Sequence, residues 1–519
     1  MKTDETEVES RGAAAVRSRW TGTLRALRAS LVDDYVKGFH QRRLLVAGVF
    51  LAIFSFDLAR PTDIDFWWHL KTGELIARTG TVPTADPFSY TAQGRPWVAH
   101  EWLWDLAVYG VYGLGGYALA ALLSALVVTL TYALLYRLLR QLGANEFVAA
   151  ALVTWAAVLA LPSVGVRPRE LTHLFLALYL SRLMLYREGR ARHLWILPPT
   201  MALWVNAHGP FILGLGVLGI FVVGGTADWL LSRGKAPRHL WVVGLATLAA
   251  SFANPYGPRM LLYPVGYYLQ GENPSLKNVT EFQSPNFHEP LYLALAASIV
   301  LLMLLGSAPG RLNLVDALLL IGFTAQTLVS VRHVAAYALV VAPLLAVRLR
   351  DRFRLARELA PPRRSPRLAA LNWLLLVAIV AVGCGYAARP DVAWRLQLGP
   401  EPSTRSLPVE GVRFVEERGL PGPVFNHQPW GGYLIYRWHP NRLVFVDGRV
   451  DMYGPDIVGE YRELADVRPG WRDVLERYGI RTILIGKDSA LSTLLQADGG
   501  WERVFQGEVE DVFVRRGSW

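Results

Sequence analysis

The stretch from Arg60 to Asp105 concentrates the side chains that could do chemistry. Its carboxylates and imidazoles are Asp63, Asp65, His69, Glu74, Asp86, His100, Glu101 and Asp105. Connections of this length without a domain of their own are usually functional or disordered, and the interspersed Trp and Phe residues argue against disorder. Carboxylates beside imidazoles can act as general bases or hold a divalent cation, so this stretch is the first candidate for an active site.

The local sequence predicts how these groups are positioned. A helix over Ile64–Ala77 would place Asp65 and His69 four residues apart on one face. Proline residues then end that helix, and His100 and Glu101 stand at the start of the next one. The alternative interpretation is that these charges cap helices at the membrane interface and contact lipid headgroups.

The composition is that of a polytopic membrane protein. Of the 519 residues 52% are hydrophobic and only 18% are charged, and the mean hydropathy is +0.26. A soluble protein would carry about 25% charge. Eleven apolar runs are long enough to cross a bilayer as helices. We predict spans at about 43–60, 106–136, 147–164, 170–186, 194–208, 210–231, 240–254, 290–307, 312–330, 334–348 and 369–387, the second beginning with a short re-entrant piece, 106–112, before a span from Tyr117.

Basic clusters alternate along the connections between these spans, so the positive-inside rule predicts a cytoplasmic N-terminus. The loops 61–105 and 255–289 and the C-terminal tail then lie outside, and residues 1–41 form a cytoplasmic tail with an amphipathic helix. The same rule explains the net charge of +11 without nucleic-acid binding. The long polar N-terminus lacks the pattern of a cleavable signal peptide. Because Cys384 is the single cysteine, no intrachain disulfide can form.

Other polar residues gather at the outer ends of the spans. They are Arg167, Asn206, His208, Arg332 and His333. Ionisable groups at membrane depth usually face a cavity and mark a function, although each could also be an interface anchor. Arg332 is the best candidate for a phosphate contact, because a guanidinium group holds phosphate bidentately.

From residue 389 the composition becomes that of a soluble, small α/β domain, which follows a transmembrane domain over 42–388. The run VRFVEER and the run GWRDVLERYG have helical spacing, whereas PVFNH, RLVFVDG, RTILIG and DVFVRR read as strands. The predicted strand in RLVFVDGR ends with Asp447 and Arg449 at its carboxyl edge, where α/β folds place ligands. The alternative for Asp447 is a turn or capping residue.

These features resemble the C-type glycosyltransferase superfamily, polytopic enzymes that use polyprenyl-phosphate-linked sugars on the outer face of the membrane. The segment DIDFWWHLKTGELIARTGTVPTADPFS resembles the first outer loop of oligosaccharyltransferase catalytic subunits, with an early Asp, a helix and an Asp-Pro pair. The layout of QPWGGYLIYRWHPNRLVFVDGR is similar to that family's WWDYG segment. Here the chain has Pro429-Trp430-Gly431-Gly432-Tyr433 without an acid, so the resemblance points away from Asn-linked glycosylation and toward another acceptor.

The resemblance implies inverting transfer of a sugar to an envelope glycan, lipid or protein hydroxyl, in a bacterial-type cytoplasmic membrane. Together with the residue types and positions described above, it leads us to predict Asp65, Asp63, Glu101 and His100 as catalytic residues. We predict substrate contacts at Arg332, His333, His69, Asn206, His208, Arg167, Trp430, Tyr433, Asp447 and Arg449. A divalent cation, Mg²⁺ or Mn²⁺, would be held by Asp63, Asp65 and Asp86.

Two other functions fit the sequence. A transporter or flippase of lipid-linked sugars would explain the spans and their buried charges, but it predicts internal symmetry that the sequence does not display. A non-catalytic envelope-assembly scaffold would keep the fold and bind glycan or partner proteins, and the altered WWDYG segment is compatible with it.

Overall fold

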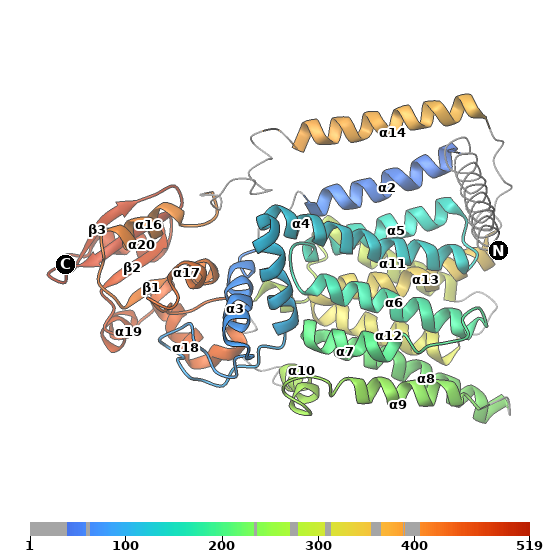
Figure 1. The fold of residues 1–519 in the computed structure, drawn as a ribbon, viewed down its shortest axis with the longest axis horizontal. Helices are drawn as coiled ribbons and strands as arrows, with labels where there is room; N and C mark the ends of the chain where they lie inside the picture. The colour runs from blue at the N-terminus through green and yellow to red at the C-terminus, as the bar shows by residue number, and fades with distance from the viewer. Residues whose placement is uncertain are drawn as a thin grey trace, which may run out of the picture.

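The computed structural model describes residues 39–58, 63–232, 236–269, 279–306, 313–353, 365–387, 389 and 405–519. A bundle of helices forms one end of the molecule and a small α/β domain the other (Figure 1). The N-terminal tail with its predicted amphipathic helix lies, up to residue 38, outside the described residues.

Every predicted span coincides with a helix of the bundle. These helices are α2 (Gln41–Leu58), α4 (Trp102–Gln141), α5 (Glu146–Ala160), α6 (Arg169–Arg187), α7 (Leu197–Ala207), α8 (Ile212–Ser232), α9 (Arg238–Ala250), α11 (Pro290–Gly306), α12 (Leu314–Val329), α13 (Val334–Arg352) and α14 (Pro366–Ala387). Among the described residues, five spans, in α4, α5, α8, α13 and α14, are both long and apolar enough to cross a membrane. The chain is therefore a multi-pass membrane protein, and eleven crossings remain a prediction.

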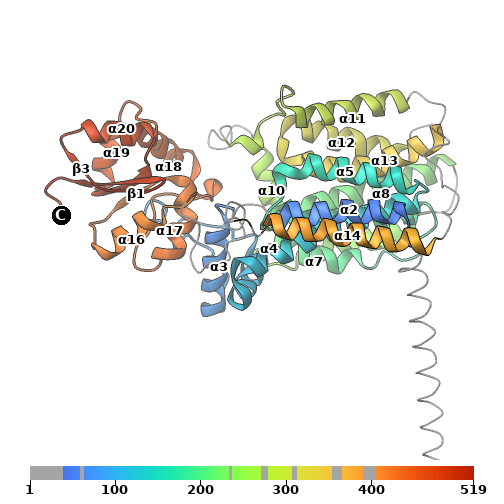
Figure 2. The same cartoon turned by 90° about the horizontal axis from the view of Figure 1, so that it is seen from above.

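The centre and the edge of the bundle differ in burial. Helix α13 is buried along most of its length, and every residue from 334 to 346 is buried. Helix α14 lies at the periphery beside α2, with most of its surface exposed (Figure 2). Its inner face is anchored by Asn372, whose Nδ2 donates to the Phe39 carbonyl at 2.9 Å, and by Trp373, which stacks on the Phe39 ring.

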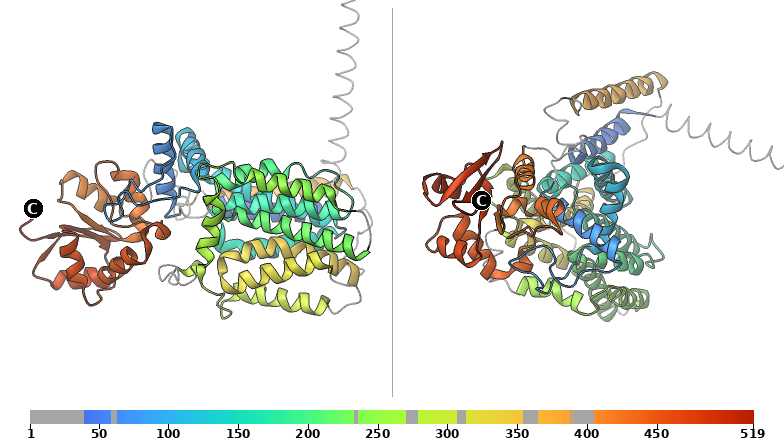
Figure 3. Two further views of the ribbon diagram at one scale, coloured as in Figure 1. Left: turned by 90° about the horizontal axis from the view of Figure 1, so that it is seen from below. Right: turned by 60° about the vertical axis from the view of Figure 1, so that its left-hand side comes forward.

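Loop 61–105, named the first outside loop after its predicted side of the membrane, contains its own helix, α3 (Phe66–Thr79), close to the predicted range. It packs against the first part of α4, and together they lie between the bundle and the α/β domain (Figure 3). Helix α4 breaks at Gly115 and Gly116, where Gly116 has a φ of 63°. This break confirms the predicted division between a short outer piece and the span that follows.

The C-terminal domain is built around a mixed four-stranded sheet. Its strands are β1 (Val424–Asn426), β2 (Thr482–Gly486), β3 (Trp501–Gln506) and β4 (Glu510–Arg515), in the order β1-β2-β4-β3. Strands β1 and β2 are parallel, and the other two pairs are antiparallel. The helices of this domain are α16 (Val409–Glu417), α17 (Gly431–Trp438), α18 (Val450–Ala465), α19 (Trp471–Arg477) and α20 (Ala490–Ala497). Strand β3 and helices α18 and α20 were not predicted.

One predicted strand is wrong, because residues 442–448 form only an isolated bridge at Val444. The reason is that a side chain takes the place of a neighbouring strand. The buried Asn426 accepts from the Phe445 N–H at 2.8 Å and donates to the Val446 carbonyl at 2.9 Å. Val444 itself bridges to Ser89 of the first outside loop.

The first outside loop and the C-terminal domain are consequently folded as one unit. The Tyr90 N–H donates to the Val444 carbonyl at 3.1 Å, and the Tyr90 hydroxyl reaches the Val424 carbonyl at 3.0 Å. At Gly432 a Cβ would lie 2.7 Å from the Ile64 carbonyl oxygen, so the start of α17 approaches α3 as closely as only glycine permits.

Substitution of Gly73 tests the close contact between α3 and α4. A Cβ at Gly73 would lie 2.0 Å from the backbone oxygen of Asp105. We expect Gly73→Ala to destabilise the protein by about 1–3 kcal/mol through overpacking, seen as a lower melting temperature of the detergent-solubilised chain. Gly48→Ala in α2 is the matched control, because a Cβ there meets nothing within 4 Å. Equal melting temperatures for the two variants would contradict the contact.

Candidate active site

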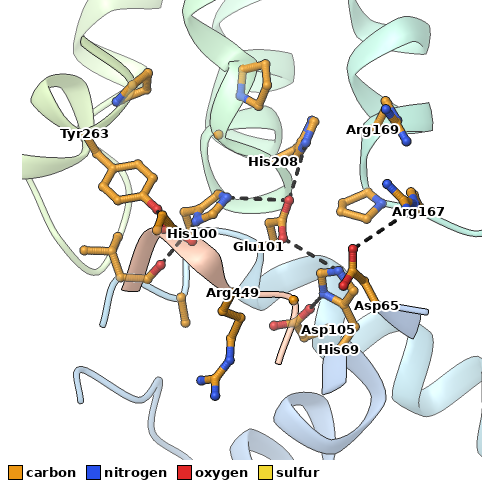
Figure 4. Close-up of a pocket in the computed structure, with 18 of the residues that line it drawn as sticks. Asp65, His69, His100, Glu101, Asp105, Arg167, Arg169, His208, Tyr263 and Arg449 are labelled. Atoms are coloured by element: carbon orange, nitrogen blue, oxygen red, sulfur yellow. Dashed lines mark hydrogen bonds and ion pairs between the residues drawn. The ribbon is translucent and has the colours of Figure 1, made fainter. Parts of the chain in front are cut away.

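A cavity of about 190 Å³ lies where the outside loops meet the C-terminal domain. Its charged lining comes from the first outside loop, the starts of α4 and α6, the α7–α8 connection, the second outside loop (predicted as 255–289), the short helix η5 (Val331–His333) and residues 449–451 at the start of α18 (Figure 4). These residues are Asp65, His69, His100, Glu101, Asp105, Arg167, Arg169, His208, Glu281, Arg332, Arg449 and Asp451. The structure thus brings together residues that are far apart in the sequence.

Asp65 stands at the N-terminal end of α3, with its side chain turned toward the cavity. Its Oδ1 accepts from the Trp68 Nε1–H at 3.2 Å, and its Oδ2 lies 3.8 Å from Arg167 Nη2. Asp63 orients this residue by accepting from the Asp65 backbone N–H at 2.9 Å, and it pairs with the Nε of Arg167. A Cβ at Gly448 would collide with Asp65, so the C-terminal domain closes one side of the carboxylate.

The environment of Asp65 makes it a base. Burial raises its pKa to about 6, the neighbouring Asp63 carboxylate adds to this, and Arg167 and His69 only partly oppose it. A quarter of the side chain is still accessible from the cavity. A carboxylate with a raised pKa binds a proton more strongly than usual and can therefore accept one from a substrate at neutral pH.

Glu101 is the centre of a histidine cluster. Its oxygens lie 3.7 Å from His69 Nε2, 3.5 Å from His100 Nε2 and 3.4 Å from His208 Nε2, as Figure 4 shows. The other nitrogen of His69 lies 2.6 Å from Asp105 Oδ1, and that of His100 lies 3.2 Å from the Val98 carbonyl. Three imidazoles from different elements are thus oriented toward one carboxylate.

His208 has a second polar contact besides Glu101. The Trp204 Nε1–H, which can only donate, is directed at Thr172 Oγ1 at 2.8 Å. The same Thr172 oxygen lies 2.8 Å from His208 Nδ1. These contacts hold the imidazole with its Nε2 facing Glu101.

The pKa of Glu101 moves in the opposite direction from that of Asp65. Burial alone would raise the pKa of Glu101, but His100 and His69 outweigh it and hold the pKa well below its usual value. Burial alone would lower the pKa of His100, but Glu101 raises it to about 9. Glu101 is thus a permanent anion and His100 a cation at neutral pH. Of the carboxylates Asp65 and Glu101, whose pKa values are pushed apart, Asp65 is the one suited to accept a proton. Burial also raises the pKa of Asp105 to about 6, but this carboxylate is engaged by His69.

Arginine side chains form the opposite part of the lining. Arg169 and Arg332 share one partner, Glu281 of the second outside loop, at 3.2 Å and 3.9 Å. Arg332 also lies over the ring of Phe282, 5.1 Å from its centroid. Guanidinium groups this close together, beside apolar side chains such as Phe282 and Ile212, can bind a phosphate group attached to a lipid.

The wall toward the C-terminal domain is aromatic. Trp97 packs edge-to-face against Trp68, and the Tyr263 ring lies 5.0 Å from the imidazole of His100. The Tyr263 hydroxyl, from α10 (Arg259–Leu269), donates to Asp451 of α18. Aromatic faces next to a carboxylate and a hydroxyl can bind a polar ring such as a sugar.

Seven of the predicted site residues do not line the cavity. They are Asp63, His333, Asn206, Trp430, Tyr433, Asp447 and Asp86. Asn206 joins helices, since it accepts from Trp102 Nε1 and donates to the Ala253 carbonyl. Trp430 donates to the Ser406 carbonyl, and the fully buried Tyr433 packs on Trp67.

Asp86 and Asp447 belong to a buried ion network around Arg449. Arg449 lies 2.9 Å from Asp86 Oδ1 and 2.6 Å from Asp447 Oδ2, and its guanidinium carbon lies 4.5 Å from the ring centroid of Trp97. The Tyr453 hydroxyl donates to Asp447. This network joins the first outside loop to the C-terminal domain and fixes Trp97, which does line the cavity.

The predicted metal ligands do not form one site. Asp63 and Asp65 are engaged by Arg167, whereas Asp86 is engaged by Arg449 and by the backbone N–H groups of the loop. In the described part of the chain, no three His, Cys, Asp or Glu side chains are placed to hold a metal ion.

Sequence reasoning gave no site role to several residues of the lining. Asp105, Arg169 and Glu281 were visible as charges on the outer side, and their shared location was the available signal. Tyr263 and Asp451 carried no local signal, because they meet only through the packing of α10 against α18.

No family model and no curated protein sequence matches the chain. Among solved structures, the arabinofuranosyltransferase AftD from Mycobacteria matches 91% of this chain and 40% of its own, with 17% identity and a TM-score of 0.51. The oligosaccharyltransferase of Archaeoglobus fulgidus matches 85% of this chain and 69% of its own, with 13% identity and a TM-score of 0.48. ArnT from Cupriavidus metallidurans, bound to undecaprenyl phosphate, matches 91% and 98%, with 15% identity and a TM-score of 0.45.

The likeness to AftD shows that the chain has the C-type glycosyltransferase fold, as the resemblance in its sequence predicted.

Removal of Arg449 tests the ion network. Arg449→Met leaves two buried carboxylates without their cation, and we expect it to destabilise the protein by about 3–5 kcal/mol. Arg472→Met is the matched control, because Arg472 also lies 4.5 Å over a Trp ring and pairs with an Asp, but its side chain is 67% exposed. Its removal should cost about 1 kcal/mol or less. Thermal unfolding of the full chain would measure both, and similar losses would argue against a buried network.

Proposed function

We propose that this protein is a membrane glycosyltransferase. It moves a sugar from a polyprenyl-phosphate donor to a cell-envelope acceptor on the outer face of a bacterial-type cytoplasmic membrane. One observation carries the proposal: Asp65, whose pKa is raised, lines the same cavity as Arg169 and Arg332. The C-type glycosyltransferase fold, shared with an arabinofuranosyltransferase, supports it.

The arginines bind the leaving group in this proposal. Arg332 and Arg169 contact the phosphate that links sugar and lipid, and they stabilise the charge that it gains as the sugar departs. Because both guanidinium groups are already held beside Glu281, little reorganisation is needed when that charge develops. The lipid chain extends along the apolar side of the lining and into the bilayer.

Asp65 activates the acceptor. An acceptor hydroxyl oxygen attacks the anomeric carbon from the face opposite the phosphate, and the bond between that carbon and the phosphate oxygen breaks. The hydroxyl proton passes to Asp65, and the configuration at the anomeric carbon is inverted. Glu101 stays ionised and keeps His100 charged beside the acceptor, so their role is electrostatic.

The acceptor is an envelope glycan, a lipid or a protein hydroxyl. The segment that corresponds in layout to WWDYG is buried, so Trp430 and Tyr433 do not contact the acceptor. The aromatic wall with Trp97, Tyr263 and Asp451 is the surface on which an acceptor sugar would stack and form hydrogen bonds.

Substitution of Asp65 tests the proposal. Membranes with the wild type should transfer radiolabelled sugar from polyprenyl-phosphate donors into envelope extract, and Asp65→Asn should reduce the rate by about 10²–10⁴-fold. Asp473→Asn, an exposed carboxylate of the C-terminal domain, is the control and should transfer normally.

The same assay separates the other two functions. Label that crosses sealed vesicles without transfer would support a transporter. Neither transfer nor transport would support a scaffold. Full activity of Asp65→Asn would refute the assigned base.

The pH dependence of transfer gives a further check. Asp65 must be ionised to accept a proton, and its pKa is raised to about 6, so kcat/KM should fall as the pH drops below that value. An ordinary aspartate would place this decline near pH 4. The wild type and Asp473→Asn should share the profile when initial rates are measured from pH 4.5 to 8. A flat profile over that range would contradict a base with this pKa.

A further inference from the structure

A carboxylate of the protein lies in the place where the donor phosphate is proposed to bind. Glu281 has one oxygen 3.2 Å from Arg169 Nη1 and the other 3.9 Å from Arg332 Nη1. Its side chain is 33% exposed and lines the cavity. One carboxylate therefore bridges two guanidinium groups that come from different parts of the chain.

The backbone holds Glu281 in this position. It belongs to the short helix η4 (Thr280–Phe282), which packs beside η5 (Val331–His333). The Val331 N–H donates to the Gln283 carbonyl at 2.9 Å, and the Ser330 hydroxyl donates to the Glu281 carbonyl at 2.8 Å. The negative charge is thus anchored to the same segment that carries Arg332.

The balance of charge around Glu281 limits what can join it. Glu281 places a fixed negative charge beside both Arg169 and Arg332, which line the cavity together with Arg167. The link in a sugar phosphodiester brings one negative charge next to this carboxylate, whereas a pyrophosphate link brings two and is repelled more strongly. Arg332 and Arg169 outweigh burial and keep the pKa of Glu281 below its usual value, so the group is ionised at neutral pH.

We propose that Glu281 makes this site selective for carrier lipids with a single phosphate, by repelling the additional charge of a pyrophosphate. The carboxylate admits one phosphate between the arginines and acts as the repulsive element against two. This inference rests on the proposed function for the premise that the cavity binds a lipid-linked phosphate.

Binding of two probe lipids to the purified full-length chain in detergent tests the proposal. The probes are one sugar linked to undecaprenol through a single phosphate and the same sugar linked through a pyrophosphate, so that the two links carry one and two negative charges. The wild type should prefer the monophosphate by about tenfold or more, since like charges forced together cost several kcal/mol. Glu281→Gln keeps the shape and removes the charge, and it should reduce the preference below about threefold by tightening pyrophosphate binding.

Two further variants complete the experiment. Glu281→Asp keeps the charge and should keep the preference. Glu289→Gln removes the same charge from an exposed position of the same loop and should behave as the wild type. An unchanged preference in Glu281→Gln, an equal loss of both probes, or a wild type that binds neither would overturn the inference. Because binding requires no transfer, a chain that shows the preference but transfers no sugar would refute the proposed function and leave the selectivity in place.

Discussion

The burial of one guanidinium group between two carboxylates is the interaction on which the outer half of the molecule depends. Arg449 of the C-terminal domain reaches Asp86 of the first outside loop and Asp447 of its own segment, and its flat face covers Trp97. A charge so deeply buried is tolerated only with its partners in place, so the loop and the domain hold one relative position. That position closes Gly448 over Asp65 and makes the cavity a defined space.

Within that cavity, the surroundings of each carboxylate determine the direction in which its pKa is shifted. Asp65 and Glu101 are both carboxylates that burial would make harder to ionise. The histidines around Glu101 reverse the effect there, whereas next to Asp65 a second carboxylate strengthens it. The same side-chain chemistry therefore yields a proton acceptor at one position and a fixed anion at the other. Opposite them, Glu281 moderates the positive charge of two arginines.

The sequence predicted most of the membrane helices, because a run of apolar residues is a local property. It also placed Asp65, His69, His100 and Glu101 near one another, since all belong to one loop and the helical spacing of the first two could be read directly. It failed where a side chain replaced a backbone partner, as Asn426 does beside residues 444–446. The sequence also predicted that Asp86 binds a metal ion and that Asp447 contacts the substrate. Their shared ion-pair partner, Arg449, becomes apparent only when the first outside loop packs against the C-terminal domain.

The interleaving of loop and domain has a consequence for how the protein is made. Thr91 donates its hydroxyl to the Phe445 carbonyl, 354 residues further along the chain. During synthesis Trp67 and Phe88, which are fully buried in the folded protein, emerge long before Tyr433 and His439, against which they pack. Until the C-terminal domain has been synthesised, this apolar surface stays exposed or must be shielded by a chaperone. The cavity can therefore take its final form only after that domain has folded onto the loop.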